Sequence, residues 1–166
     1  MEINFVILLI SAIIPLLIGF IWYHPKVFGN VWMKLADISD EKLKSGNMAL
    51  IFGVTLVFSF FLAFVLQFMV IHQYSVYSIL ANEPGINDPN SEVGSMLKMF
   101  LDKYGNNFRT FKHGAFHGIL SALFFATPVL GINALFERKS FKYIFVHAGY
   151  WMLTLALMGG VICAYA

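Results

Sequence analysis

The sequence predicts an all-α membrane protein with four transmembrane helices and an amphipathic helix in the long second loop. Of the 166 residues, 59% are hydrophobic and only 12% are charged, whereas soluble domains carry roughly 25% charged residues. Four apolar segments also reach the length of about 20 residues that a helix needs to cross a bilayer. These segments are expected to be helical, because lipid offers no hydrogen-bond partner to open backbone groups.

The four predicted spans have short first and third loops between them and a long second loop. We take residues 1–166 as a single membrane domain. The first span is not interpreted as a cleaved signal peptide, because it begins with acidic Glu2 and its apolar run exceeds the usual roughly 7–15 residues. Pro15 and Pro128 fall inside spans, where each removes a backbone donor and is expected to kink its helix. The spans cover residues 3–23, 48–71, 113–136 and 141–165.

The second loop is predicted to contain one amphipathic helix over residues 91–104. Its apolar residues recur at helical spacing, with charged residues on the other face and Gly105 at the end. We therefore expect this helix to lie flat on the membrane or to cap the helix bundle. The apolar stripe consists of Val93, Met96, Leu97, Phe100, Leu101 and Tyr104.

Basic residues near the spans predict the orientation of the chain. The first and third loops share one side of the membrane and carry seven Lys and Arg residues, whereas the other side carries four. Loops on the cytoplasmic side are enriched in Lys and Arg. We therefore predict a multi-pass protein of the inner (cytoplasmic) membrane, with both termini and the long second loop on the extracytoplasmic side.

Small residues recur every four positions in the third and fourth spans. Such rows let two helix backbones approach closely. We predict that the rows serve as packing surfaces, between the two helices or between copies of the chain. The third span carries Gly114, Gly118, Ala122 and Ala126, and the fourth carries Ala156, Gly160 and Ala164.

Three histidines are expected to gather at the outer face if the second and third spans pack together. His113 and His117 are one helical turn apart, and His72 ends the second span. A histidine pair at i, i+4 can supply two of the three protein ligands of a zinc site. The segment lacks the glutamate of an HExxH motif, so three interpretations stay open: a structural or interfacial role with no cofactor, a metal or haem site, and proton handling.

Further polar residues fall inside the spans or at their ends, namely Gln67, Asn133, Glu137 and His147. Asn133 and Glu137 are one turn apart at the depth of His147, so we expect His147 or Tyr143 to donate a hydrogen bond to Glu137. Two interpretations are open. These residues either form interhelical hydrogen bonds worth on the order of 1 kcal/mol or act as the inner station of a proton relay.

The stretch after the first span carries the pattern W-Y-x-P-x-x-F-G-x-x-W. It resembles a widespread bacterial family of small membrane proteins known as domain of unknown function 1761. The resemblance continues through "HGAFHG", through "LFERKS" at residues 135–140 and through Gly149-Tyr150, and it leaves out the loop from Asn82 to Asn107. It implies four spans and bacterial origin, and no established activity. The pattern consists of Trp22, Tyr23, Pro25, Phe28, Gly29 and Trp32.

Three functions remain open at this point. The first is a non-enzymatic structural or accessory subunit that self-associates or binds a membrane protein partner. The second is a small oligomeric ion or proton channel or transporter, lined by His117, Asn133 and His147. The third is a membrane-embedded metal or haem protein that uses His72, His113 and His117.

Other classes are disfavoured by the sequence. The net charge is only +2 and the basic residues lie in loops, so nucleic acid is not an expected partner. The sequence contains no P-loop, no dinucleotide fingerprint and no nucleophile motif, which argues against the common soluble enzyme classes. The lipid bilayer is the partner that the apolar spans require.

Overall fold

The computed structural model describes residues 2–166, and within that range it contains helices and no strands. The predicted all-α fold with four helices long and apolar enough to cross a membrane is confirmed. The third of these helices consists of α7, a π-helical segment η2 and α8. The membrane-length helices are α1 (Phe5–Trp22), α4 (Met48–Val70), α7–η2–α8 (Phe111–Ser121, Ala122–Ala126 and Thr127–Phe136) and α9 (Phe141–Tyr165).

Each membrane-length helix begins at a polar cap. Asn4, Asn47, Thr110 and Ser140 each accept a hydrogen bond, through the side chain, from a backbone amide three residues later. Such caps satisfy one of the otherwise unpaired amides at a helix start. The four boundaries are therefore encoded locally, and they set which residues occupy the first turn of each helix.

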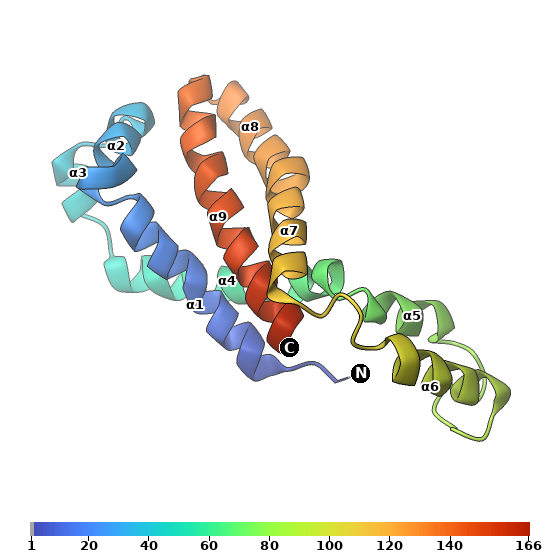
Figure 1. Cartoon of the computed structure of the whole chain (residues 1–166). Coiled ribbons are helices and arrows are strands. Elements are labelled where there is room, and N and C mark those ends of the chain that lie inside the picture. Colours follow the sequence, from blue (N-terminus) through green and yellow to red (C-terminus); the bar gives the residue numbers. More distant parts are fainter. Residues whose placement is uncertain (1) are drawn as a thin grey trace.

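The two ends of the bundle differ in the loops that they carry. At one end, Nζ of Lys139 in the third loop donates to the carbonyl oxygen of Ala36 in the first loop at 3.3 Å. At the other end, Nδ2 of Asn4 donates to the carbonyl oxygen of Tyr165 at 3.4 Å. Figure 1 shows both chain ends close together there, next to the start of the second loop segment. The first end also holds a π-helical segment η1 (Pro25–Gly29) and the short helices α2 (Asn30–Ala36) and α3 (Asp40–Lys44).

The second loop forms a helical arm that extends away from the bundle (Figure 1). It contains α5 (Gln73–Leu80) and α6 (Glu92–Tyr104), so the predicted amphipathic helix is present. Figure 1 shows α6 beside α5 and apart from the membrane-length helices, so α6 does not cap the bundle, and the alternative that it lies flat on the membrane stays a prediction. Leu97 is 7% exposed and lines a hollow together with Tyr77 of α5, whereas Met96 is 48% exposed.

The third membrane helix contains a π-turn immediately before Pro128. The amide of Thr127 donates to the carbonyl oxygen of Ala122, five residues earlier. Proline cannot donate a backbone hydrogen bond, and its ring crowds the carbonyl of the preceding turn. We predicted a kink of the helix at Pro128, and the helix responds to this proline with a widened π-turn at residues 122–126.

The closest helix contact is between α7 and α9. A Cβ atom added to Gly114 would overlap the carbonyl oxygen of Gly159, and one added to Gly118 would overlap that of Leu155. The third-span row therefore packs as predicted, but its main partner is the row of Leu155, Gly159 and Cys163. The fourth-span row of Ala156, Gly160 and Ala164 is displaced from this contact by one residue, and Gly160 faces the ring of Phe111.

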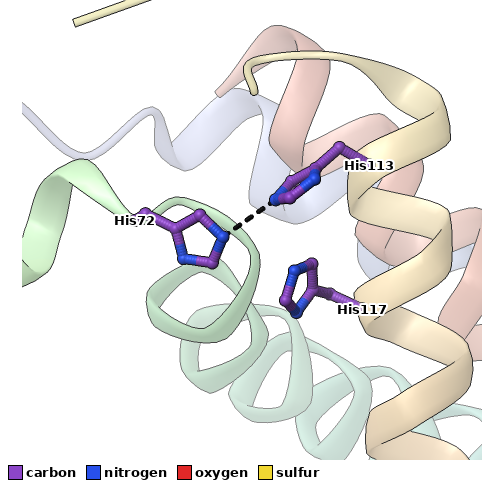
Figure 2. A group of neighbouring side chains, drawn as sticks. All are labelled: His72, His113 and His117. Carbon is purple, nitrogen blue, oxygen red and sulfur yellow. Dashed lines mark hydrogen bonds between the residues drawn. The ribbon is translucent and has the colours of Figure 1, made fainter. Parts of the chain in front are cut away.

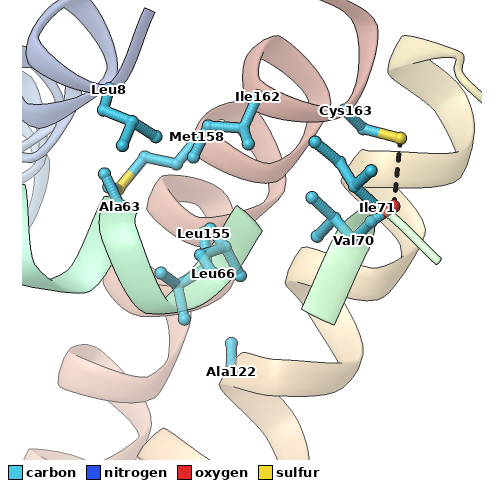
Figure 3. Close-up of a cluster of buried hydrophobic side chains, with 10 residues drawn as sticks. All are labelled: Leu8, Ala63, Leu66, Val70, Ile71, Ala122, Leu155, Met158, Ile162 and Cys163. Atoms are coloured by element: carbon cyan, nitrogen blue, oxygen red, sulfur yellow. Dashed lines mark hydrogen bonds between the residues drawn. The ribbon is translucent and has the colours of Figure 1, made fainter. Parts of the chain in front are cut away.

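Four membrane helices meet in one apolar core (Figure 3). The core joins α1 and α4 to the α7–α9 pair and fixes the end of α4 against α9. The thiol of Cys163 lies 3.2 Å from the carbonyl oxygen of Val70. The buried cluster consists of Leu8, Ala63, Leu66, Val70, Ile71, Ala122, Leu155, Met158, Ile162 and Cys163.

Candidate metal centre between α4 and α7

Three histidine side chains face one another at the end of the bundle that carries the arm (Figure 2). His72 lies two residues after the end of α4, whereas His113 and His117 project from the first two turns of α7. One ring nitrogen from each residue lies within 4.8 Å of the others. Nε2 of His113 is 2.8 Å from Nε2 of His72. The predicted gathering of these three residues is thus present in the fold.

Local structure explains how each histidine reaches this position. Ile71 adopts an extended conformation that ends α4, so His72 lies at the corner between α4 and α5. Thr110 caps α7 and places His113 in the first turn, where the His113 amide donates to the Thr110 hydroxyl at 3.3 Å. His117 follows one turn later on the same face of the helix.

Aromatic rings surround the cluster, and no carboxylate belongs to it. The Phe108 ring centroid is 5.0 Å from that of His113 and 6.4 Å from that of His72. The Phe116 ring lies 5.7 Å from His117 on the other side. His72 is exposed, and His113 and His117 are half-buried. Histidine binds a metal ion through its neutral imidazole, so the three side chains of this group would bring no negative charge to an ion.

The arrangement suits a metal ion that takes nitrogen ligands and keeps one open position. Zinc binds imidazole nitrogen at about 2.0–2.1 Å, so tetrahedral ligand atoms lie roughly 3.3 Å apart. The observed separations, 2.8 Å for the His72–His113 pair and at most 4.8 Å within the group, bracket that distance.

A second histidine site lies at the opposite end of the bundle, around His147. The hydroxyl of Tyr23 is 2.9 Å from Nδ1 of His147, and the Tyr143 ring is 4.3 Å from the imidazole. Among the described residues, no hydrogen bond joins Glu137 to His147 or to Tyr143, so the expected hydrogen bond is wrong. Glu137 and Asn133 are both exposed. The reason is that α1 packs against α9 at this depth, which the helical spacing within the third span cannot reveal.

Residues of the aromatic pattern after the first span form much of this second site. Nε1 of Trp22 donates to the carbonyl oxygen of Val146 at 3.1 Å, and the Tyr23 ring lies 5.2 Å from that of Trp32. Phe28 packs on Trp22 at 4.6 Å. A Cβ atom at Gly29 would overlap the carbonyl oxygen of Tyr23, so the tight turn after α1 requires glycine.

Both histidine sites fall within the region that one family model matches. That model, described as a protein of unknown function (DUF1761), matches residues 6–163, nearly the whole chain. The chain belongs to the DUF1761 family. Neither the curated proteins nor the solved structures contain a match to this DUF1761 chain.

Two features of this DUF1761 protein were not expected from its sequence. Tyr23, a residue of the aromatic pattern, is the hydrogen-bond partner of His147. Gln67 connects α4 to α5. Its side-chain amide donates to the carbonyl oxygen of Phe64 in α4 at 3.0 Å, and its side-chain oxygen accepts a hydrogen bond from the Tyr74 hydroxyl in α5 at 3.3 Å. These contacts satisfy Gln67, so it is not part of the metal centre.

Proposed function

We propose that this chain is an integral membrane protein that binds a divalent transition-metal ion, with the ligand preference of zinc, through His72, His113 and His117. The observation that carries the proposal is the convergence of three ring nitrogens within 4.8 Å of one another. Three protein ligands and one open position are the usual arrangement of a zinc site that also binds water or another small ligand.

Two properties of the cluster favour a metal over a purely structural role. His72 and His113 are 41 positions apart in the sequence. A metal ion bound to both would hold the end of α4 against the start of α7, and so would fix the two ends of the arm together. In addition, histidines inside a membrane domain are costly unless they have a partner. A shared cation satisfies three imidazoles at once.

The other two functional hypotheses receive less support. His117 belongs to the metal centre, His147 packs on α1, and Asn133 is exposed on α8, so the residues of the suggested channel do not share one path. The third-span row of small residues is covered by α9 of the same chain, and Gly160 of the fourth-span row is covered by the Phe111 ring, so self-association would require a different surface. A membrane protein partner or a homo-oligomer remains a proposal without an assigned contact.

We also propose that the metal centre, both termini and the arm lie on the extracytoplasmic side of a bacterial inner membrane. The greater number of basic residues in the first and third loops supports this orientation. A C-terminal fusion to a reporter that works only in the cytoplasm should be inactive. An active reporter would reverse the orientation and leave the metal proposal unchanged.

Metal binding is tested by titrating the purified, metal-stripped protein with Zn²⁺ in competition with a chromogenic chelator. We expect one ion per chain, and a loss of affinity of about tenfold or more in His113→Ala and in His117→Ala, since even changes outside the ligands cost about 10–100-fold. His24→Ala is the matched control, because His24 is exposed and its Nδ1 accepts a bond from the Lys26 amide. Equal affinity in all four proteins would refute the proposal.

A further inference from the structure

A groove in the arm opens directly beside the candidate metal centre. It has a volume of about 360 Å³, within the roughly 300–1,000 Å³ of small-molecule sites. His72 forms one end of the groove, and its walls are mainly apolar. They include Val76 of α5, Phe100 and Tyr104 of α6, and Phe108 of the following loop.

The loop that lines the groove beside His72 is held in place. The side-chain amide of Gln73, which is buried, donates to the carbonyl oxygen of Asn107 at 2.9 Å and fixes the loop on α5. The next residue, Phe108, adopts a left-handed conformation with φ of 62°, which is unfavourable for a bulky side chain. This strained conformation directs the ring toward His72 and His113, and such strain is concentrated at functional sites.

The charge of the centre selects the kind of ligand that can occupy its open position. Three neutral imidazoles leave the full charge of a divalent ion uncompensated, and the cluster contains no carboxylate. Lys112, next to His113 in the sequence, adds one positive charge, whereas the Arg109 guanidinium is directed to α9, where it donates to the carbonyl oxygens of Cys163 and Ala166. An anion in the open position therefore gains favourable electrostatic energy in this partly buried site.

We propose that the carboxylate of a single-chain fatty acid occupies the open position, with its hydrocarbon chain in the groove. This inference rests on the proposed metal site. A carboxylate oxygen is an ordinary ligand of zinc, and the apolar walls exclude the aliphatic chain from water. The location of the groove at the end of the membrane helices gives it access to amphiphiles from the bilayer.

Cobalt substitution provides a direct test, because the visible absorption of bound Co²⁺ responds to its fourth ligand. The Co²⁺-loaded full-length protein in phosphatidylcholine nanodiscs is titrated with myristate, acetate or tetradecanol. We expect myristate to change the spectrum at a concentration at least about tenfold below that of acetate, a ratio of affinities worth about 1.4 kcal/mol. Tetradecanol, which has the chain without the carboxylate, should leave the spectrum unchanged.

The groove itself is tested by Val76→Trp, which fills it, with Ile79→Trp on the same helix as the matched control. Ile79 is 79% exposed and does not line the groove. Val76→Trp should weaken the response to myristate about tenfold and leave Co²⁺ affinity and the response to acetate unchanged. Ile79→Trp should behave as the wild type.

The outcomes separate the two proposals. Normal Co²⁺ binding with equal responses to myristate and acetate would overturn the fatty-acid site and leave the metal site standing. A response to lysophosphatidic acid without one to myristate would overturn it in favour of a phosphate headgroup. Co²⁺ spectra that are the same in the wild type and in His113→Ala would refute the metal centre itself.

Discussion

The two ends of the bundle both place histidines among aromatic rings, yet they are built for different tasks. At the arm end, the nitrogens of His72 and His113 face each other at 2.8 Å, and a third imidazole lies beside them. At the opposite end, the single imidazole of His147 faces the phenol of Tyr23 at 2.9 Å. A candidate ligand site therefore differs from a packing site in that the ring nitrogens of several histidines face one another. The presence of a histidine alone does not distinguish the two.

The difference follows from where each histidine lies in its helix. His72 is exposed at a chain corner and His113 lies in a first turn, so both can move slightly to accept an ion. His147 is about two turns into α9, and its Nε2 is buried without a partner among residues 2–166. Tyr23, Trp32 and Tyr143 pack around its ring or its partner, which leaves the imidazole little freedom to reorient.

The largest expected effect comes from breaking the contact that positions α7 at the arm end. Gly118→Leu places a side chain against the backbone of Leu155 and Ala156, and a packed helix backbone cannot yield as a flexible side chain does. We expect a loss of unfolding free energy of about 1–3 kcal/mol or more. The measurement is the melting temperature of the purified protein in detergent.

Gly53→Leu is the matched control for this change, because a Cβ atom at Gly53 meets nothing within 4 Å. It should be neutral, or slightly stabilising by up to about 1 kcal/mol from helix propensity. Equal melting temperatures for the two variants would show that the close contact between α7 and α9 is not important for stability.

The next effect distinguishes the two histidine sites by their response to zinc. At a free Zn²⁺ concentration of about 100 times Kd, binding should stabilise the wild-type protein by about 2.7 kcal/mol, and a chelator should reverse the gain. His117→Ala should lose this response because it removes a ligand. The measurement is the shift of the melting temperature on addition of Zn²⁺.

His147→Ala serves as the comparison at the opposite end. It should lower the melting temperature in the absence of metal, because Tyr23 loses its partner, and it should keep the zinc-dependent increase. A zinc response that disappears in His147→Ala and persists in His117→Ala would reverse the roles assigned to the two ends.

The smallest effect is expected from Tyr23→Phe, which removes only the hydroxyl that bonds His147. The loss should be about 1 kcal/mol, the usual contribution of one hydrogen bond, with no change in the affinity for Zn²⁺. Chemical unfolding and the competitive titration measure the two quantities. A changed affinity for Zn²⁺ would indicate that the two ends of the bundle are coupled.

Much of the fold could be predicted from local sequence patterns. The length of the apolar segments predicted four membrane helices. Caps such as Ser39 and Ser140 are equally local, because a cap needs only a polar side chain and an amide three residues later. The apolar stripe predicted a helix over residues 91–104, and α6 covers Glu92–Tyr104. The pattern could not predict what this helix packs against, since an apolar face fits either α5 or the bundle.

The sequence by itself determined where the four membrane helices and α6 lie to within a few residues, which residues are apolar enough for lipid, and that His113 and His117 share one helix face, whereas α5 was not predicted. Only the tertiary structure decided that His72 meets this pair, that Gly114 faces Gly159 and not Gly160, and that Tyr23 contacts His147. The physical reason is the range of the interactions. Helix formation depends on neighbours within one or two turns, whereas these contacts depend on how far each helix rotates and tilts when four of them pack into one core.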